Sequence, residues 1–180
     1  MITIVGFLSR PHGYNALCGI IDNPNYKLLK VFTHKLKPKS EDSSRSERKD
    51  YILFKQICRK NNIPLEAIDS NSQIINNVPQ CDFIVEISWR YLISQEIVKQ
   101  ASTLTFGVHR GKLPEYAGSE PIKQALEKNE SKIVLSSHHL AEEIDSGGTI
   151  NTISHLVNYD NSKSLDANVQ RLRNEITPMF

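Results

Sequence analysis

The residues of this sequence best suited to acid–base chemistry are His109 and Asp145, which lie 36 positions apart. An imidazole titrates near neutral pH, so His109 suits proton transfer or a hydrogen bond to a developing oxyanion. Asp145 precedes Ser-Gly-Gly, a composition typical of a turn. If that turn brought Asp145 beside His109, the carboxylate would stabilise the imidazolium and hold its tautomer.

A strand and a rigid loop are predicted to position His109. The run Leu104–His109 is apolar and strand-like, and Gly111, Pro114 and Gly118 punctuate the segment after it. Loops held on a rigid sheet often carry function. The pattern therefore places His109 where a strand ends and a candidate site begins.

Strand-like and helix-like segments alternate along the whole chain. The expected strands are Ile2–Leu8, Leu28–His34, Leu65–Asp69, Cys81–Trp89, Leu104–His109, Lys132–His138 and Thr149–Asn158. The expected helices are Tyr14–Asp22, a helix from about Tyr51 to Asn61, Gln95–Ala101, Ile122–Asn129 and Ser164–Ile176. This alternation predicts an α/β fold with a mainly parallel sheet, in which ligands bind beyond the carboxyl ends of strands.

Local signals indicate where some of these elements begin. Residues 9–13 are predicted to form a turn, and Lys35–Arg48 a polar loop. Ser44 and Glu47 have the spacing of a capping box for the next helix, and Pro121 suits a first helical position.

Composition limits the classes of function. The chain has 180 residues, which suits one domain. Its formal net charge of +2 is too small to indicate a nucleic-acid-binding surface. No signal peptide and no apolar run long enough to span a membrane is visible. The three cysteines do not have the spacing of a zinc site. Because their number is odd, they cannot all pair in disulfides. We therefore expect a cytoplasmic protein that binds neither nucleic acid nor a membrane.

Two further clusters have competing interpretations. A metal site would need His109, one of His138 and His139, and Glu142, but their spacing matches no metal motif, so no metal is expected. Adjacent strand residues point to opposite faces, so only one of the two neighbouring histidines can face the site. Trp89 and its neighbours form either a core edge with a solvated arginine or the wall of a pocket.

Taken together, these motifs resemble a known family. The segment Phe83 to Ile150 is similar to the catalytic domain of the 10-formyltetrahydrofolate-dependent formyltransferases, and the N-terminal half agrees more loosely in layout. That superfamily includes the glycinamide ribonucleotide, methionyl-tRNA and sugar-nucleotide enzymes. The resemblance implies a Rossmann-like formyltransferase fold with helices on both faces of the sheet. It also implies a single formyltransferase-like domain over residues 1–180 without an additional C-terminal domain.

The family's motifs recur in order. His109 matches the catalytic histidine, Leu113–Gly118 matches the Leu-Pro-x-Tyr-x-Gly loop, and Pro121 matches the proline that opens a helix. Asp145 matches the catalytic aspartate, and His138 matches a histidine of the purine-pathway members. The resemblance implies that an amine attacks the formyl carbon of 10-formyltetrahydrofolate, the co-substrate of one-carbon metabolism, while His109 and Asp145 stabilise the oxyanion or move protons.

The resemblance also implies where the folate binds. The residues that correspond to the folate pocket are Trp89, Arg90 and Leu92 in one segment and Leu140, Glu142 and Ile144 in another. The expected acceptor is the amine of a small molecule, with a nucleotide-linked amino sugar as one candidate. A tRNA acceptor is not expected, and a homodimer is left open.

Gly107 departs from the family pattern, because an asparagine normally stands two positions before the histidine. Losing one oxyanion donor typically costs roughly 100- to 1,000-fold in rate. Another donor could substitute, with Ser119, Ser137, His138 or a water as candidates. Alternatively, the acceptor or the one-carbon donor is unusual, or the protein binds its ligands without efficient turnover.

Overall fold

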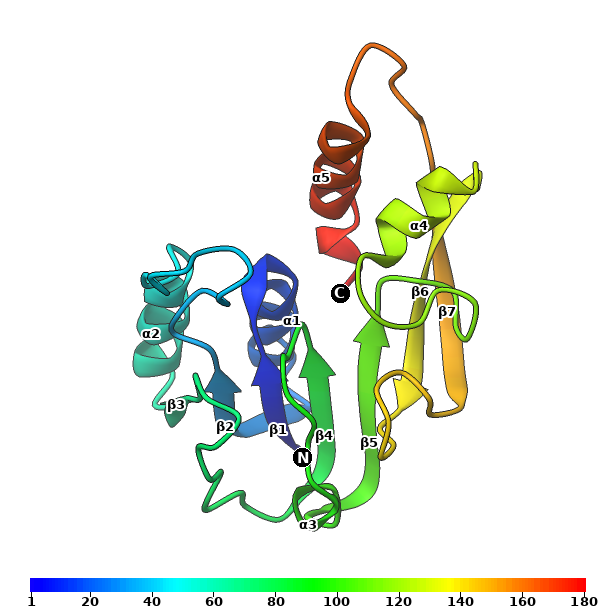
Figure 1. Ribbon diagram of the computed structural model, residues 1–180. Coiled ribbons are helices and arrows are strands. Elements are labelled where there is room, and N and C mark those ends of the chain that lie inside the picture. Colours follow the sequence, from blue (N-terminus) through cyan, green and yellow to red (C-terminus); the bar gives the residue numbers. More distant parts are fainter. The chain divides into compact units, whose positions relative to one another are not determined.

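Seven strands form one sheet in the order β3-β2-β1-β4-β5-β6-β7 in a computed structural model that describes residues 1–180 (Figure 1). The strands are β1 Ile2–Leu8, β2 Tyr26–Thr33, β3 Leu65–Ala67, β4 Cys81–Ile87, β5 Ala101–His109, β6 Lys132–His139 and β7 Thr149–Leu156. The helices are α1 Arg10–Asp22, α2 Tyr51–Lys60, α3 Gln95–Val98, α4 Pro121–Glu127 and α5 Leu165–Glu175, followed by a 3-10 turn at Thr177–Met179. No helix has the length and apolar character needed to cross a membrane.

The chain divides into two compact units, residues 1–105 and 106–180. In the first unit, β1 pairs in parallel with β2 and β4, and β2 pairs in parallel with β3. In the second unit, β5, β6 and β7 pair antiparallel. The predicted α/β alternation with parallel strands is therefore strongest in the N-terminal unit. The prediction of a single domain stays a prediction.

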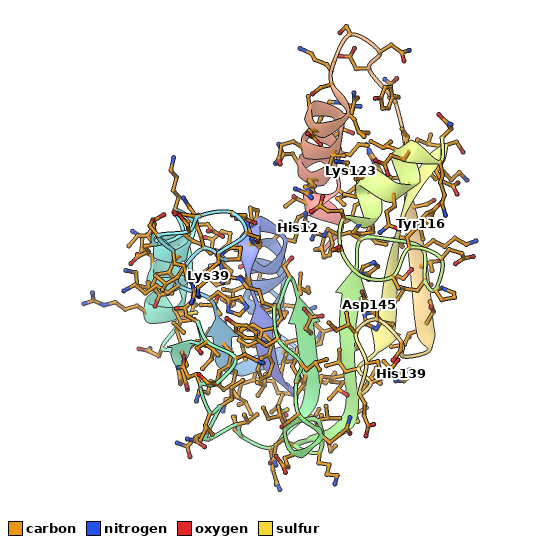
Figure 2. All side chains as sticks on the ribbon, viewed as in Figure 1. His12, Lys39, Tyr116, Lys123, His139 and Asp145 are labelled. Carbon is orange, nitrogen blue, oxygen red and sulfur yellow. The ribbon has the colours of Figure 1, made fainter.

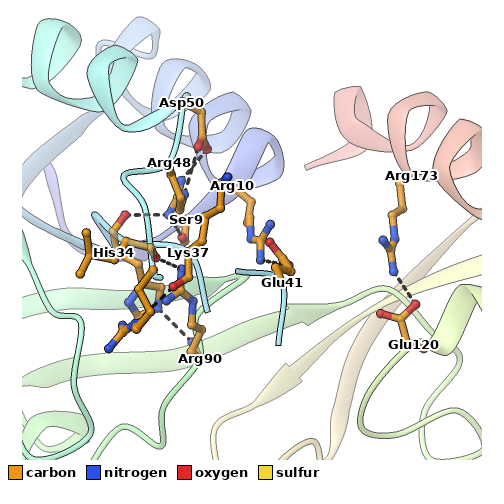
Figure 3. A network of polar contacts seen from close by, with 12 residues as sticks. Ser9, Arg10, His34, Lys37, Glu41, Arg48, Asp50, Arg90, Glu120 and Arg173 are labelled. Atoms are coloured by element: carbon orange, nitrogen blue, oxygen red, sulfur yellow. Dashed lines mark hydrogen bonds and ion pairs between the residues drawn. The ribbon is translucent and has the colours of Figure 1, made fainter. Parts of the chain in front are cut away.

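Each unit has its own apolar core. In the first unit, buried side chains of the central strands pack with those of α1 and α2, among them Phe7, Leu17, Phe32, Phe54 and Ile84. In the second unit, one cluster joins α4, β6 and α5 through Ile122, Leu126, Ile133, Leu135, Val169 and Leu172. An ion pair between Arg173 and Glu120, at 2.5 Å, ties α5 to the segment before α4 (Figure 3). The second core supports the strands and the loop that carry His109.

Two local predictions are wrong. The predicted turn over residues 9–13 is instead the start of α1, because Pro11 is compatible with a first helical turn and the helix begins at Arg10. The predicted capping box is absent, since Ser44 donates to Asp42 Oδ1 at 2.6 Å and α2 begins only after Asp50. The N–H and hydroxyl of Ser44 are thus both bound by the Asp42 carboxylate, in a turn that precedes the helix.

Candidate active site

His109 lies at the carboxyl end of β5, where the strand meets the loop that leads to α4. Its side chain is 10% exposed, and its Nδ1 lies 3.1 Å from Oδ2 of Asp145. Its Nε2 lies 2.7 Å from the main-chain carbonyl oxygen of Tyr116. Figure 2 labels Tyr116 and Asp145 in this part of the second unit. Both ring nitrogens of His109 therefore contact oxygen atoms of the protein.

The Asp145 carboxylate contacts three groups: the rings of His109 and His138 and the main-chain N–H of Gly118. Besides His109, its Oδ2 accepts a hydrogen bond from the Gly118 N–H at 2.9 Å, and its Oδ1 lies 3.5 Å from Nε2 of His138. The backbone of Asp145 is left-handed, with φ of 56°, a conformation that aspartate tolerates better than most residues. The structure thus brings together three residues that the sequence singled out: His109, His138 and Asp145.

The pairing of β5 with β6 explains why these side chains share a face. In the antiparallel register Gly107 is opposite His138, and His109 is opposite Ser136. Alternate residues of a strand point to the same side, so all four positions lie on one face. His138 is buried and His139 is exposed, which agrees with the expectation that only one of the two faces the site.

Ser136 is a site residue that sequence reasoning missed. It is fully buried, and its hydroxyl donates to the Gly111 carbonyl at 2.8 Å and accepts from the Leu113 N–H at 3.3 Å. It therefore fastens the loop after His109 to β6. The signal that could have found it is strand alternation, which puts Ser136 on the face of His138.

Two other candidate donors lie elsewhere. Ser137 donates to the Asn151 carbonyl at 3.2 Å and points to the opposite face of β6. Ser119 is exposed, and no contact joins its hydroxyl to His109. The structure therefore does not bring either hydroxyl to the His109–Asp145 pair.

Burial lowers the pKa of His109, while the Asp145 carboxylate and the Tyr116 carbonyl act to raise it. The neighbouring His138 and Arg110 lower it further. The net lowering of this pKa favours a neutral imidazole near neutral pH, the form that accepts a proton. The adjacent carboxylate then stabilises the imidazolium that forms.

Trp89 and Arg90 contact other residues of the first unit through ring stacking and hydrogen bonds. The Trp89 ring stacks on His34, with ring centroids 4.1 Å apart, and meets Phe7 edge-on at 5.1 Å. The Arg90 guanidinium, expected to be solvated in one interpretation, is half-buried and donates to the Leu36 carbonyl (Figure 3). Three donors on these two residues, Nε1 of Trp89 and Nε and Nη1 of Arg90, are buried without an acceptor.

The other residues assigned to the folate pocket differ in exposure. In the first unit Leu92 is 57% exposed, whereas in the second unit Ile144 is 67% exposed. Glu142 is also exposed, and Leu140 is half-buried. No group of three or more His, Cys, Asp or Glu side chains is arranged to hold a metal ion.

His34, beside Trp89, is a buried neutral histidine. Its Nδ1 donates to the Ile68 carbonyl, and its Nε2 accepts from the Arg90 N–H at 3.1 Å. Burial lowers the pKa of His34 to about 3, and the charges of Arg90 and Arg48 act in the same direction. Arg48 is itself buried, donates to the His34 carbonyl at 2.8 Å and pairs with Asp50 (Figure 3).

Stability is therefore expected to fall in acid through His34. In the unfolded chain a histidine binds its proton near pH 6.5, whereas the folded pKa is about 3. The unfolded state binds more protons between these values, so the contribution is complete above pH 6.5 and is lost as the pH falls toward 3. The expected loss is about 2 kcal/mol at pH 5. Urea unfolding at pH 7 and pH 5, compared between the protein and His34→Gln, measures it.

The exposed His139 provides the control for this prediction. His139→Gln is expected to keep the acid sensitivity of the parent protein, because the ring it removes is exposed. Equal losses of stability between pH 7 and pH 5 in the parent and in His34→Gln would show that His34 does not carry the effect.

Comparison with known proteins identifies the family. Residues 16–179 match the sequence model of a family described as formyl transferase. The methionyl-tRNA formyltransferase of Clostridium acetobutylicum is 28% identical over 128 residues, which cover 68% of this chain and 40% of that protein. The chain therefore matches less than half the length of this curated relative.

Solved structures show the same fold. The phosphoribosylglycinamide formyltransferase of Bacillus halodurans superposes with a TM-score of 0.67 at 17% identity, covering 99% of this chain and 90% of that one. WlaRD, a sugar 3N-formyl transferase studied with dTDP and 5-N-formyl-THF, superposes with a TM-score of 0.62 at 19% identity, covering 99% and 61%. The predicted Rossmann-like α/β fold is confirmed. Because the family match extends over nearly the entire sequence, the chain belongs to the formyl transferase family.

Proposed function

We propose that this protein transfers a formyl group from 10-formyltetrahydrofolate to the amine of a small molecule. The observation that carries the proposal is the contact between His109 Nδ1 and Asp145 Oδ2, at 3.1 Å and largely buried. Membership of the formyl transferase family supplies the reaction class, and this pair supplies groups that can move a proton.

The proposed reaction needs a proton to be taken up at one atom and returned at another. As the amine nitrogen bonds to the formyl carbon, the bond from that carbon to N10 of the folate breaks. The amine loses one proton and N10 gains one, so no proton is consumed overall. His109 and Asp145 accept the first proton and return it, and no covalent bond to the protein is needed.

The ring contacts of His109 leave neither nitrogen free for a ligand. Its Nδ1 faces Asp145, and its Nε2 is within 2.7 Å of the Tyr116 carbonyl. Either role, accepting a proton from the amine or donating to an oxyanion, therefore requires the contact between Nε2 and Tyr116 to open. His109 is proposed as the general base, because burial lowers its pKa and Asp145 stabilises the imidazolium that forms.

We further propose folate contacts in each unit separately: Trp89, Arg90 and Leu92 in the first, and Leu140, Glu142 and Ile144 in the second. The buried donors of Trp89 and Arg90 that lack acceptors support a ligand rich in acceptor atoms, because such donors are costly to leave unsatisfied. A folate carries carboxylates and carbonyl groups and so fits this requirement. The exposed side chains of Leu92 and Ile144 supply apolar surface.

A nucleotide-linked amino sugar is the acceptor proposed for the first assays. This choice is supported by the structural similarity to a sugar 3N-formyl transferase studied with dTDP. The test mixes purified protein and 10-formyltetrahydrofolate with dTDP- and UDP-linked amino sugars, glycinamide ribonucleotide or methionyl-tRNA. Release of tetrahydrofolate with only one acceptor identifies it. If no folate binds and none turns over, the proposed function is wrong.

A second function, ligand binding without efficient turnover, is favoured by Gly107. This glycine is buried and opposite His138, so position 107 presents no side-chain amide on the face of His109. In the family, an asparagine at this position helps to stabilise the oxyanion. A protein without that donor could bind its folate or nucleotide sugar and react slowly.

Gly107→Asn is expected to raise kcat by roughly 10- to 100-fold, because an amide on this face can donate to the oxyanion. Steady-state kinetics measures the gain, and calorimetry with 5-formyltetrahydrofolate checks that folate affinity persists. Gly19→Asn, at an exposed helical glycine with no atom near its side-chain position, is the matched control. Intact affinity without any turnover in parent and variant would favour the binding function.

A further inference from the structure

Strand β7 lies at one end of the sheet and has an edge without a partner. In the strand order it follows β6 and has no neighbour on its other side, and Figure 1 shows it as the outermost strand of the second unit. Three of its apolar side chains are exposed to solvent: Ile150 by 44%, Ile153 by 44% and Leu156 by 70%. An edge of this kind offers main-chain N–H and C=O groups to another strand.

The composition of β7 does little to protect this edge. Proteins usually blunt an edge strand with charged side chains, proline, a bulge or a short length. The edge strand of the first unit, β3, has only three residues, and its Glu66 forms an ion pair with Lys30 at 2.8 Å. In contrast, β7 has eight residues and contains no Lys, Arg, Asp, Glu or Pro. Its register with β6 shifts only near its start, so residues 151–156 form a regular strand that is open to pairing.

The pairing of β7 with β6 decides which main-chain groups reach the open edge. The Val157 N–H donates to the Ser131 carbonyl at 2.9 Å, and the same antiparallel register continues back along β7 to residue 151. Hydrogen-bonded and non-hydrogen-bonded pairs alternate along an antiparallel ladder. Residues 151, 153 and 155 therefore direct their main-chain groups toward β6. Those of Thr152, Ser154 and Leu156 point to the open edge.

These outward groups limit how two copies of β7 can pair with one another. A symmetric dimer repeats the same contacts about a two-fold axis, so two antiparallel β7 strands would pair about one centre. Their main-chain hydrogen bonds form only where outward-facing residues are opposite one another, and all of these residues have even numbers. The axis must therefore pass through one residue, Thr152, Ile153 or Ser154, and not between two residues.

An axis at Ile153 gives the best match of side chains. It places Thr152 opposite Ser154 of the second copy and brings the two copies of Ile153 into contact. Ile150 is then opposite Leu156. An axis one residue to either side would instead place Ile153 against a polar side chain. Because cross-strand pairs of apolar side chains stabilise a sheet, the register centred on Ile153 is favoured.

We propose that β7 pairs with β7 of a second copy of this chain, antiparallel and centred on Ile153, so that the C-terminal units of the two copies share one sheet. No carboxylate or ammonium group of the strand opposes this pairing, and the ring of His155 already contacts Glu175 at 2.9 Å. A single pair of short strands buries less surface than a standard interface of about 1,600 Å². The dimer is therefore weak, with a Kd of roughly 10–100 µM.

Sedimentation equilibrium of the whole chain at about 1–500 µM tests the self-association, because this range spans the expected Kd. Ile153→Lys is expected to weaken the dimer at least about 10-fold, since it removes an apolar contact and places two ammonium groups opposite one another. Ile52→Lys makes the same change on α2, at a side chain that is 45% exposed, and should leave the dimer unchanged. A monomer at every concentration, as expected if the edge instead receives a strand of another protein, would overturn the proposal. So would equal dimerisation of the two variants.

Disulfide cross-linking tests the register. Opposite residues of a non-hydrogen-bonded antiparallel pair have Cα atoms about 4.5 Å apart, within the range of a disulfide. Ile153→Cys is therefore expected to form a covalent dimer on mild oxidation, whereas Ser154→Cys, at a position opposite Thr152, is not. The parent protein, with its three free cysteines, measures the background. Cross-linking of Ser154→Cys alone, or of neither variant above background, would contradict the pairing, and neither test depends on formyl transfer.

Discussion

Asp145→Asn is expected to lower kcat/KM for formyl transfer by roughly 100- to 10,000-fold, the range for removal of a general acid–base group. The carboxylate lies 3.1 Å from His109 and 3.5 Å from His138, so both imidazoles lose their anionic partner at once. An amide of the same shape can still fill the space, which keeps the effect electrostatic. Steady-state kinetics with the identified acceptor measures the change.

The same variant has a signature in pH. The Asp145 carboxylate acts to raise the pKa of His109, so its removal should lower that pKa and move the acid limb of the rate profile to lower pH. Glu143→Gln makes the same acid-to-amide change at an exposed position of the same loop and should leave both rate and profile unchanged. Normal kcat/KM in Asp145→Asn would exclude this carboxylate from the reaction.

Gly147→Ala is expected to reduce activity about as much as Asp145→Asn, although the residue touches no reacting group. A Cβ at position 147 would lie 1.8 Å from the carbonyl oxygen of His139 and 2.7 Å from its carbon. Both atoms belong to the backbone of β6 and cannot turn aside as a side chain could. The loop that carries Asp145 must therefore move away from the strand, and the carboxylate with it.

Stability should fall together with activity. Forcing a methyl group into a tightly packed site typically costs about 1–3 kcal/mol, which urea unfolding can measure. Gly148→Ala is the matched control, because its nearest neighbour would be a His139 ring atom at 3.9 Å, an ordinary contact. Equal activity in the two variants would mean that close packing at position 147 does not hold Asp145 in place.

Much of the fold follows from local patterns in the sequence. The apolar runs that predict Ile2–Leu8 and Lys132–His138 correspond to β1 and β6, and Pro121 opens α4 as expected. Such runs predict strands because burying alternate or consecutive apolar side chains stabilises them wherever the chain places them. Short polar motifs were less dependable, as the absent capping box at Ser44 illustrates.

The sequence alone determined the family, the order of strands and helices, and the residue types of the site: His109, His138 and Asp145. Only the tertiary structure decided which groups these side chains contact. The carbonyls of Tyr116 and His139 contact the rings of His109 and His138, and Gly147 packs closely against the His139 backbone. The physical reason is that every residue carries a main-chain carbonyl, so residue type cannot tell which carbonyl will face a histidine. That choice depends on contacts between segments distant in the chain, which form only when the loops pack against β6.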